Sequence, residues 1–583
     1  MRRSGTGAGS FITVRSVLTI GYDMSGSNAA HDRLAVGERE DVPSRAENLE
    51  AGKRLAEIVR TTLGPNGLDK MLITDDGTVA ITNDGASILE RMTLSHPAAT
   101  LVLEVAQGQD TTVGDGTTTA VVLAGGLLDE AESLLERGVS PAKITEGYHL
   151  AVSRAVETLS ELTVSVDLEN DERLRDIAST TVTGKWDESG TAFVADRAVK
   201  AVRAIERDGR VGFERLTRKT IPGGSFYDSA VIDGLVIDMG TSSTDVVSPE
   251  GALPNRYRDA TVALIDEALS IDTPQGVGRV DLESYEEYER LREYERDVYE
   301  EYVDTVVGVG ADVVFCQQAI DDPVRYRLAE EGVLAVERTQ RDELHRLARA
   351  TGGKPVPVGS LTRATTGTAA SVERRSLGPT DVTVVSGLEE LGQVSAVFRG
   401  GTQHVADETK RVLDTCFYAL KLAVEDEAVV PGAGAIEVAL ARELRSFAAG
   451  RDGTEQLAVE AFADVLETVP RTLAETSGIR PTDALLELRT AHHDGNHTAG
   501  LDLETGSVVD AADQGVLEPL YVKRQALACA GEAASMIVRI DDAVPMATQV
   551  EDAGHDHDHD HGPGGLVRST EGYPWAVGHS MGH

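Results

Sequence analysis

The chain has 583 residues, 41% of them hydrophobic, which is enough for about two to four domains with substantial cores. Its 97 acidic and 55 basic residues give a formal net charge of -42. A surface this negative repels nucleic acids and anionic membranes, so neither is an expected partner. The acids are spread along the chain and most bases are arginine, which favours a protein from a salt-loving archaeon; an ordinary acidic cytosolic protein is the alternative.

The cysteine pattern indicates a reducing compartment. Cys316, Cys416 and Cys529 lie far apart and show no CxxC spacing, so we expect a cytoplasmic protein without structural disulfides. No apolar run approaches the roughly 20 residues that a membrane helix needs. The N-terminal FITVRSVLTIGY is interrupted by Arg15, which argues against a signal peptide, and Met24 is an alternative start of the chain.

The first third of the chain predicts helices joined by glycine-containing turns. Apolar residues recur at helical spacing over 46–63, and the helix should end at the Gly/Pro turn 64–67. The stretch MLITDDGTVAITNDGASIL predicts two short strands about a DDG turn, followed by the NDG turn 83–85. Residues 97–137 predict two helices joined by a GDG loop.

Later segments predict a mixed α/β region and further helices. Residues 283–307 predict a long charged helix with tyrosines on one side, and 305–320 predict a buried strand flanked by helices. Residues 455–489 are again helical in pattern. In the His/Asp-rich tail, a disordered and solvated segment is favoured over loose binding of a transition metal.

The stretch VGDGTTTAVV, residues 113–122, carries the clearest chemistry. A glycine-flanked turn entering a helix presents backbone N–H groups and the positive end of the helix dipole, which suit an anion. The hydroxyls of Thr117, Thr118 and Thr119 add donors for phosphate oxygens. A carboxylate beside phosphates needs a hard cation between them, so Asp115 is interpreted as a magnesium ligand. The alternative is that Asp115 or Thr117 only caps the helix.

Two further turns lie within about fifty residues of this stretch. LGPNG, residues 63–67, can bring backbone amides to a phosphate. The NDG turn offers Asp84, an acid suited to orienting a water for in-line attack. Together these turns predict a nucleotide site, and one without a Walker A loop because no GxxxxGK[ST] occurs.

A set of motifs in one order and spacing resembles the group II chaperonins, which include the archaeal thermosome and its eukaryotic cytosolic relatives. The resemblance covers roughly residues 35–546. The motifs are TTLGPNGLDKML, ITNDGASIL, HPAA, VGDGTTTAVVLAGGLL, TGK, GADVVFCQQAIDD, FRGGTQHVADE, VVPGAG and VRIDD.

The resemblance implies an ATP-driven folding chamber of two stacked rings, each with about eight or nine subunits. It implies a multidomain α+β chaperonin fold with a mostly helical equatorial domain, a small intermediate domain, and an α/β apical domain with a helical protrusion. The implied cofactors are ATP and Mg²⁺, and the implied partners are unfolded protein clients and related subunits of a homo- or hetero-oligomeric double ring.

The domain division implied by the resemblance has five parts. They are a disordered or non-native extension 1–34, an equatorial ATP-binding domain 35–143 and 411–546, an intermediate domain 144–228 and 380–410, an apical substrate-binding domain with a lid protrusion 229–379, and a disordered tail 547–583.

Site residues are carried over onto matching positions. Asp84 matches an acid that handles the attacking water, Lys185 of TGK matches a lysine that senses the terminal phosphate, and Asp115 matches the magnesium ligand. The implied nucleotide-binding residues are Thr62, Leu63, Gly64, Pro65, Gly85, Gly116, Thr117, Thr118, Thr119, Gly401, Gly432, Ala433 and Glu518.

The chain departs from the family pattern at the second catalytic acid, where Thr415 stands. Threonine cannot act as a base near neutral pH, and the neighbouring Asp414 is rotated by about 100° on the helix. We therefore hypothesise that the subunit binds ATP and hydrolyses it slowly; a local helix bulge that returns Asp414 to the site is the alternative. Ala433 replaces a glycine, and Glu518 stands where the family has an aspartate, which is a mild change.

Two other functions stay open at this point. One is a structural ring subunit that binds nucleotide and contributes substrate-binding surface without turnover, and Thr415 favours it. The other is an unrelated phosphotransferase that uses the same loops, which predicts a monomer with a small-molecule pocket.

Overall fold

The computed structural model describes residues 44–73, 79–94, 96–239, 253–271, 285–378, 380–387 and 392–541, all within the unit Pro43–Asp542. The predicted extension 1–34, the tail 547–583 and the DDG turn lie outside the described residues.

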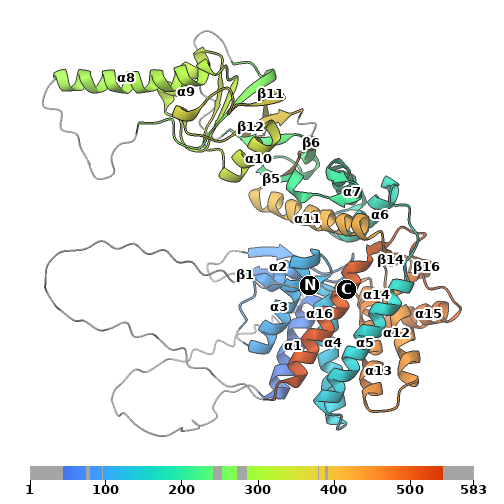
Figure 1. Ribbon diagram of the computed structural model, residues 1–583. Helices are drawn as coiled ribbons and strands as arrows, with labels where there is room; N and C mark the ends of the chain where they lie inside the picture. Colours follow the sequence, from blue (N-terminus) through green and yellow to red (C-terminus); the bar gives the residue numbers. More distant parts are fainter. Residues whose placement is uncertain are drawn as a thin grey trace, which may run out of the picture. The chain divides into compact units, whose positions relative to one another are not determined.

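A large helical bundle is built from both ends of the described chain (Figure 1). Its first helix, α1, ends at Arg60, close to where the Gly/Pro turn predicts, and a capping box between Ser44 and Glu47 fixes its start. The predicted helix pair over 97–137 is confirmed. The bundle helices are α1 (Arg45–Arg60), α2 (Gly85–Glu90), α3 (Pro97–Val113), α4 (Thr117–Glu136), α5 (Pro141–Glu161), α12 (Ala435–Ala449), α13 (Glu455–Leu466), α14 (Thr468–Thr476), α15 (Pro481–His493) and α16 (Leu520–Arg539).

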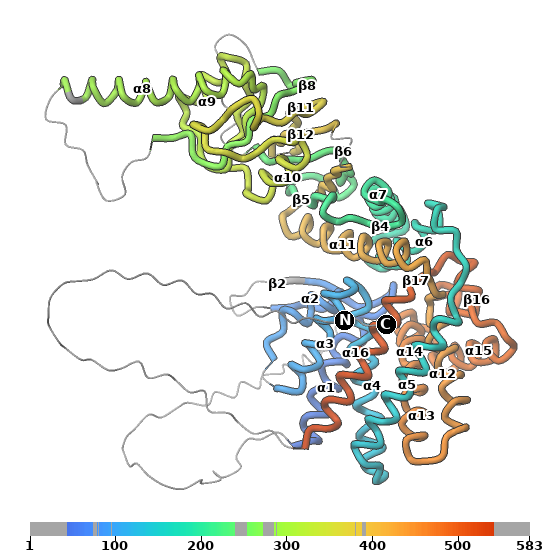
Figure 2. Tube along the Cα trace, viewed as in Figure 1, coloured from blue at the N-terminus to red at the C-terminus, as the bar shows by residue number. Residues whose placement is uncertain are grey.

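The first and last helices pack side by side, as the blue and red ends of the trace show in Figure 2. Arg45 links the two helices: its Nε donates to the carbonyl of Ile540 at 3.1 Å, and its guanidinium forms an ion pair with Asp541 at 2.8 Å. The buried core runs from α1 through α4 and α5 to α13 and α16. The helices that carry the loops at the ends of this bundle therefore share one packed core.

A second core lies where α6 (Asp171–Val182), α7 (Glu188–Ile205) and α11 (Gln403–Asp426) pack together. Strand β13 (Val394–Gly400) lies between β5 (Leu216–Pro222), which is parallel to it, and β6 (Ala230–Asp233), which is antiparallel. A short hairpin joins β3 (Glu206–Arg207) to β4 (Arg210–Val211), and two 3₁₀ turns, η1 (Phe213–Arg215) and η2 (Phe226–Asp228), flank β5.

The third part is a six-stranded mixed sheet in the order β10, β9, β8, β11, β12, β7. Its strands are β7 (Leu235–Asp238), β8 (Arg256–Ile265), β9 (Val313–Cys316), β10 (Leu334–Val336), β11 (Gly367–Leu377) and β12 (Thr380–Ser386). Side chains alternate across β9, so Val313 and Phe315 join the core that includes α10 (Arg341–Thr351). Val314 and Cys316 join the opposite core, with α8 (Tyr285–Gly308) and α9 (Asp322–Glu330).

These elements confirm the predicted fold class, a multidomain α+β fold with a mostly helical part and mixed sheets. They also confirm the charged helix predicted at 283–307 and the buried strand predicted within 305–320. The helical pattern of 455–489 resolves into three helices, α13 to α15. None of the helices in the described part of the chain combines the length and apolar character that a bilayer crossing requires.

Two predicted domain boundaries cut helices, and a third separates two paired strands. The boundary at 143/144 cuts α5, and the boundary at 410/411 cuts α11, which contributes to the second core as far as Val424. The boundary at 379/380 separates the paired strands β11 and β12. Motif spacing locates turns, whereas a domain boundary follows the packing of whole helices and hairpins. The naming of the parts as equatorial, intermediate and apical stays a prediction.

Candidate functional site

A cavity of about 600 Å³ lies where the turns of the helical bundle meet α11 and the turn between α6 and α7. Three two-stranded sheets stand around these turns: β1 (Lys70–Ile73) with β2 (Val79–Thr82), β14 (Val429–Pro431) with β17 (Leu517–Pro519), and β15 (Ala499–Leu501) with β16 (Val508–Asp510). The predicted site residues that line the cavity are Thr62, Leu63, Gly64, Pro65, Asp84, Gly85, Asp115, Gly116, Thr117, Thr118, Thr119, Lys185, Ala433 and Glu518.

Gly401 and Gly432 are the predicted site residues that do not line the cavity. Gly401 is exposed just before α11, and the α11 residues at the cavity begin with Arg411, about 12 Å along the helix axis from the first residue of α11. Gly401 therefore lies at the start of α11 in this structure, and its assignment to the nucleotide site stays a prediction. Gly432 lies behind the residues that line the cavity. Its N–H donates to the carbonyl of Val516 at 2.9 Å, and a Cβ at this position would come within 2.8 Å of the Glu518 side chain.

The GDG loop delivers the N-terminus of α4 to the cavity. Gly114 ends α3 and Gly116 precedes α4, both with positive φ, and a Cβ on Gly116 would come within 2.9 Å of Gln109 and Val522. Among the described residues, Asp115 Oδ1 accepts the N–H of Gly116 alone, at 2.6 Å, and Gly116 lies before the first residue of the helix. No hydrogen bond from the backbone N–H groups of Thr117 to Thr119 is found within the described part of the chain. The capping alternative therefore does not account for this loop, and the helix end is open to an anion.

The carboxyl of Asp115 is buried at the cavity and can bind a cation. Burial chiefly, with a smaller contribution from the charge of Glu518, raises the pKa of Asp115 to about 7, although the Gly116 N–H and Lys523 oppose this. Within the described ranges, no group of three or more His, Cys, Asp or Glu side chains is arranged to hold a metal ion. Magnesium commonly takes one or two carboxylates and completes its shell with phosphates and water, so a single buried aspartate beside an anion seat fits it.

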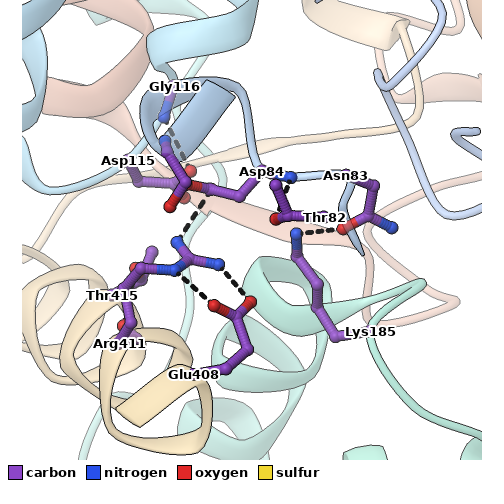
Figure 3. Close-up of polar contacts among 10 residues, drawn as sticks. Thr82, Asn83, Asp84, Asp115, Gly116, Lys185, Glu408, Arg411 and Thr415 are labelled. Atoms are coloured by element: carbon purple, nitrogen blue, oxygen red, sulfur yellow. Dashed lines mark hydrogen bonds and ion pairs between the residues drawn. The ribbon is translucent and has the colours of Figure 1, made fainter. Parts of the chain in front are cut away.

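Two partners hold the side chain of Asp84 in place. It is the N-cap of α2 and accepts from the N–H of Ser87 at 2.7 Å, and its Oδ1 pairs with Arg411 at 2.8 Å (Figure 3). Burial alone would raise the pKa of Asp84, but the positive charges of Arg411 and Lys185 outweigh it and hold the pKa below its ordinary value. Asp84 is therefore ionised at neutral pH and engaged by cations, which lowers its basicity.

Lys185 reaches the cavity from the turn between α6 and α7. Its Nζ donates to the side-chain oxygen of Asn83, next to Asp84, as Figure 3 shows. Burial, and then the charge of Arg411, lower the pKa of Lys185 despite the attraction of Asp84. An ammonium group in this position can interact with a phosphate.

Thr415 lines the cavity, and α11 is an unbroken helix on both sides of it. Its hydroxyl donates to the carbonyl of Arg411 at 3.2 Å. Asp414 does not line the cavity, because its carboxylate pairs with Lys410 at 2.9 Å and with Arg218 at 3.3 Å. The alternative of a helix bulge that returns Asp414 to the site is therefore not supported.

Sequence reasoning missed several cavity residues. Arg411 lies one turn before Thr415 on the same face of α11, and this four-residue spacing could have predicted that both line the cavity. Lys523 pairs with Glu518 at 3.0 Å and with Glu437 at 2.8 Å, and it follows Glu518 closely in sequence. Asp110 also lines the cavity, and burial and the charge of Asp84 raise its pKa.

Comparison with known proteins identifies the class. The model of the TCP-1/cpn60 chaperonin family matches residues 55–548, and the chain belongs to this family. Its relatives are thermosome subunits, which confirms the predicted resemblance to group II chaperonins.

Three of these relatives show the extent of the match. The thermosome subunit alpha of Halobacterium salinarum is 41% identical over 502 residues, covering 86% of this chain and 88% of the relative. The thermosome subunit of Methanopyrus kandleri is 44% identical over 504 residues, covering 85% of this chain and 91% of the relative. The thermosome subunit beta of Archaeoglobus fulgidus is 43% identical over 502 residues, covering 85% of this chain and 91% of the relative.

Proposed function

We propose that this chaperonin subunit binds ATP with Mg²⁺ in the cavity and uses the nucleotide to drive the enclosure and folding of unfolded proteins. The observation that carries the proposal is the open N-terminus of α4 directly beside the buried carboxyl of Asp115. An anion seat and a cation ligand side by side suit a metal-bound polyphosphate.

Phosphate oxygens would be held by groups of this chain. The backbone N–H groups at the start of α4 and the hydroxyls of Thr117, Thr118 and Thr119 are donors, and Lys185 adds a positive charge from the opposite wall. When bound, Mg²⁺ would be held by Asp115 and would neutralise charge on the phosphates. Asp84 would orient the attacking water and accept its proton as the terminal P–O bond breaks.

The rest of the cavity suits a nucleoside. Apolar side chains complete its lining, and a purine base needs such surfaces on its faces. They are Val469, Leu473, Leu501, Leu503, Val509 and Val516.

Calorimetric titration with ATP in the presence and absence of Mg²⁺ tests the proposal. We expect Asp115→Asn to lose the magnesium-dependent part of the affinity. Asp110→Asn is a matched control, because it removes another carboxylate of the same cavity that we do not place at the metal. Absence of nucleotide binding to the unmodified protein, or equal magnesium dependence in both variants, would overturn the proposal.

A second candidate is a subunit that binds ATP and turns it over weakly or not at all, serving a structural or substrate-binding role. Two observations favour it: Thr415 stands in the cavity wall, and Asp84 is engaged by Arg411. Hydrolysis by this subunit would then depend on Asp84 alone.

The implied assembly is a double ring of identical or related subunits in the cytoplasm, with unfolded proteins as clients. Mass measurement of the native particle in high salt tests this. A megadalton-scale particle supports the ring, whereas a monomer would contradict it.

A further inference from the structure

The turn that carries Lys185 is fixed from both sides. Lys185 follows the C-cap of α6 and precedes the N-cap of α7, and its backbone N–H donates to the carbonyl of Val182 at 3.2 Å. Lysine has a long side chain that loses much rotamer freedom when held, so its placement at the cavity depends on a well-fixed backbone. The structure supplies two contacts that fix it.

The first contact is with the loop 63–67. Gly184 has φ +85°, and a Cβ at this position would collide with the carbonyl oxygen of Pro65. The turn thus lies directly on the backbone of a loop that lines the cavity, with no room for a side chain between them.

The second contact is an aromatic cluster beneath the turn. The indole of Trp186 stacks on Phe226 with ring centroids 5.4 Å apart and an interplanar angle of 15°. Phe193 meets the ring of Phe226 edge to face at 5.7 Å, and Arg197 lies over Phe193 at 4.6 Å. Since Phe226 belongs to η2 and Phe193 to α7, the cluster joins the turn to two separate elements.

Close backbone contacts also surround Trp186. Trp186 forms a bridge with Thr183 across the turn. Gly190, in the first turn of α7, leaves the space that Trp186 occupies, because a Cβ there would come within 2.7 Å of the Trp186 Cβ. An indole is large and has only two side-chain torsions, so it fixes its backbone at a low entropic cost.

We propose that Trp186 is a positioning residue that holds Lys185 at the terminal-phosphate end of the cavity. Trp186 does not line the cavity, so it acts through its neighbour and not by contact with a ligand. The proposal rests on the proposed nucleotide site for its functional consequence, whereas its structural part concerns the turn alone.

Two measurements separate these parts. The first is hydrogen exchange of the backbone amides at 183–187 in the nucleotide-free full chain, comparing Trp186→Ala with Trp186→Phe. We expect exchange about tenfold or more faster in the alanine variant, and near-normal exchange in the phenylalanine variant, which keeps the stacking. Tyr227→Ala is the matched control, because it removes a ring that contacts Phe193 and Phe226 in the same cluster.

The second measurement is the ratio of the dissociation constants for ADP and ATP, each with Mg²⁺. A charge-assisted contact between lysine and phosphate accounts for about a 10- to 100-fold preference, which Trp186→Ala should lose and Trp186→Phe should keep. Lys185→Ala should lose the same preference, and the double variant should lose no more than Lys185→Ala alone.

Unchanged exchange at 183–187 in Trp186→Ala overturns the inference whatever the nucleotide data show. Losses that add in the double variant also overturn it, because Trp186 would then act independently of Lys185. If exchange rises as expected but the unmodified chain binds no nucleotide, the proposed function fails and the structural role of Trp186 stands.

Discussion

Replacing Thr415 by aspartate should raise the rate of ATP hydrolysis. Thr415 lines the cavity with Asp84, and its hydroxyl cannot take a proton from water near neutral pH. A positioned general base contributes about 10²–10⁴-fold. The gain should fall at the lower end, about 10²-fold, because Arg411 lies one helical turn away and would pair with the new carboxylate and lower its pKa.

The assay is single-turnover release of phosphate from a particle assembled from the variant chain. Thr415→Asn is the matched control, since asparagine has the size of aspartate and no basic carboxylate. We expect Thr415→Asp to be about 10²-fold faster than both the unmodified protein and Thr415→Asn. Equal rates in the unmodified and aspartate chains, or an equal gain with asparagine, would refute the reasoning.

Four other outcomes follow from the structure. Asp84→Asn should slow phosphate release by about 10²-fold or more while nucleotide affinity changes little, and stopped-flow kinetics with a binding titration checks this. The pKa of Asp115 in the folded protein, about 7, lies above its unfolded value, so the protonated carboxyl stabilises the nucleotide-free protein. This contribution to the free energy of unfolding is lost as the pH rises toward 7. Since Mg²⁺ needs the ionised form, its affinity should fall about tenfold per pH unit below 7, and Asp115→Asn should abolish this pH dependence in a titration series. Glu467→Gln should lower the free energy of unfolding by about 3 kcal/mol in chemical denaturation, because the fully buried carboxylate of Glu467 pairs with Arg445 and Arg489; a loss under 1 kcal/mol would contradict this.

The local elements were predictable because their signals are local. The apolar spacing of residues 46–63 reflects one buried helix face, and the glycines around Asp115 mark a turn that only positive φ allows. The role of Asp84 was indicated by the NDG turn and by the family resemblance, that of Lys185 by the resemblance alone, and the structure brings both to one cavity.

The remaining features depend on long-range packing. The pairing of Arg411 with Asp84 joins segments that are distant in sequence, and neither residue alone predicts the other. Gly401 was assigned from a motif alone; in the structure it precedes α11 and does not line the cavity, so its role in nucleotide binding stays a prediction. The contact of Trp186 with Phe226 likewise exists only because α7 and η2 fold together.

The most direct test of the central claim is the structure of the particle with Mg²⁺ and a non-hydrolysable ATP analogue. We predict a triphosphate at the N-terminus of α4, a metal ion on Asp115, and Lys185 beside the terminal phosphate. A cavity that stays empty at saturating analogue, or a nucleotide bound elsewhere on the subunit, would contradict the account.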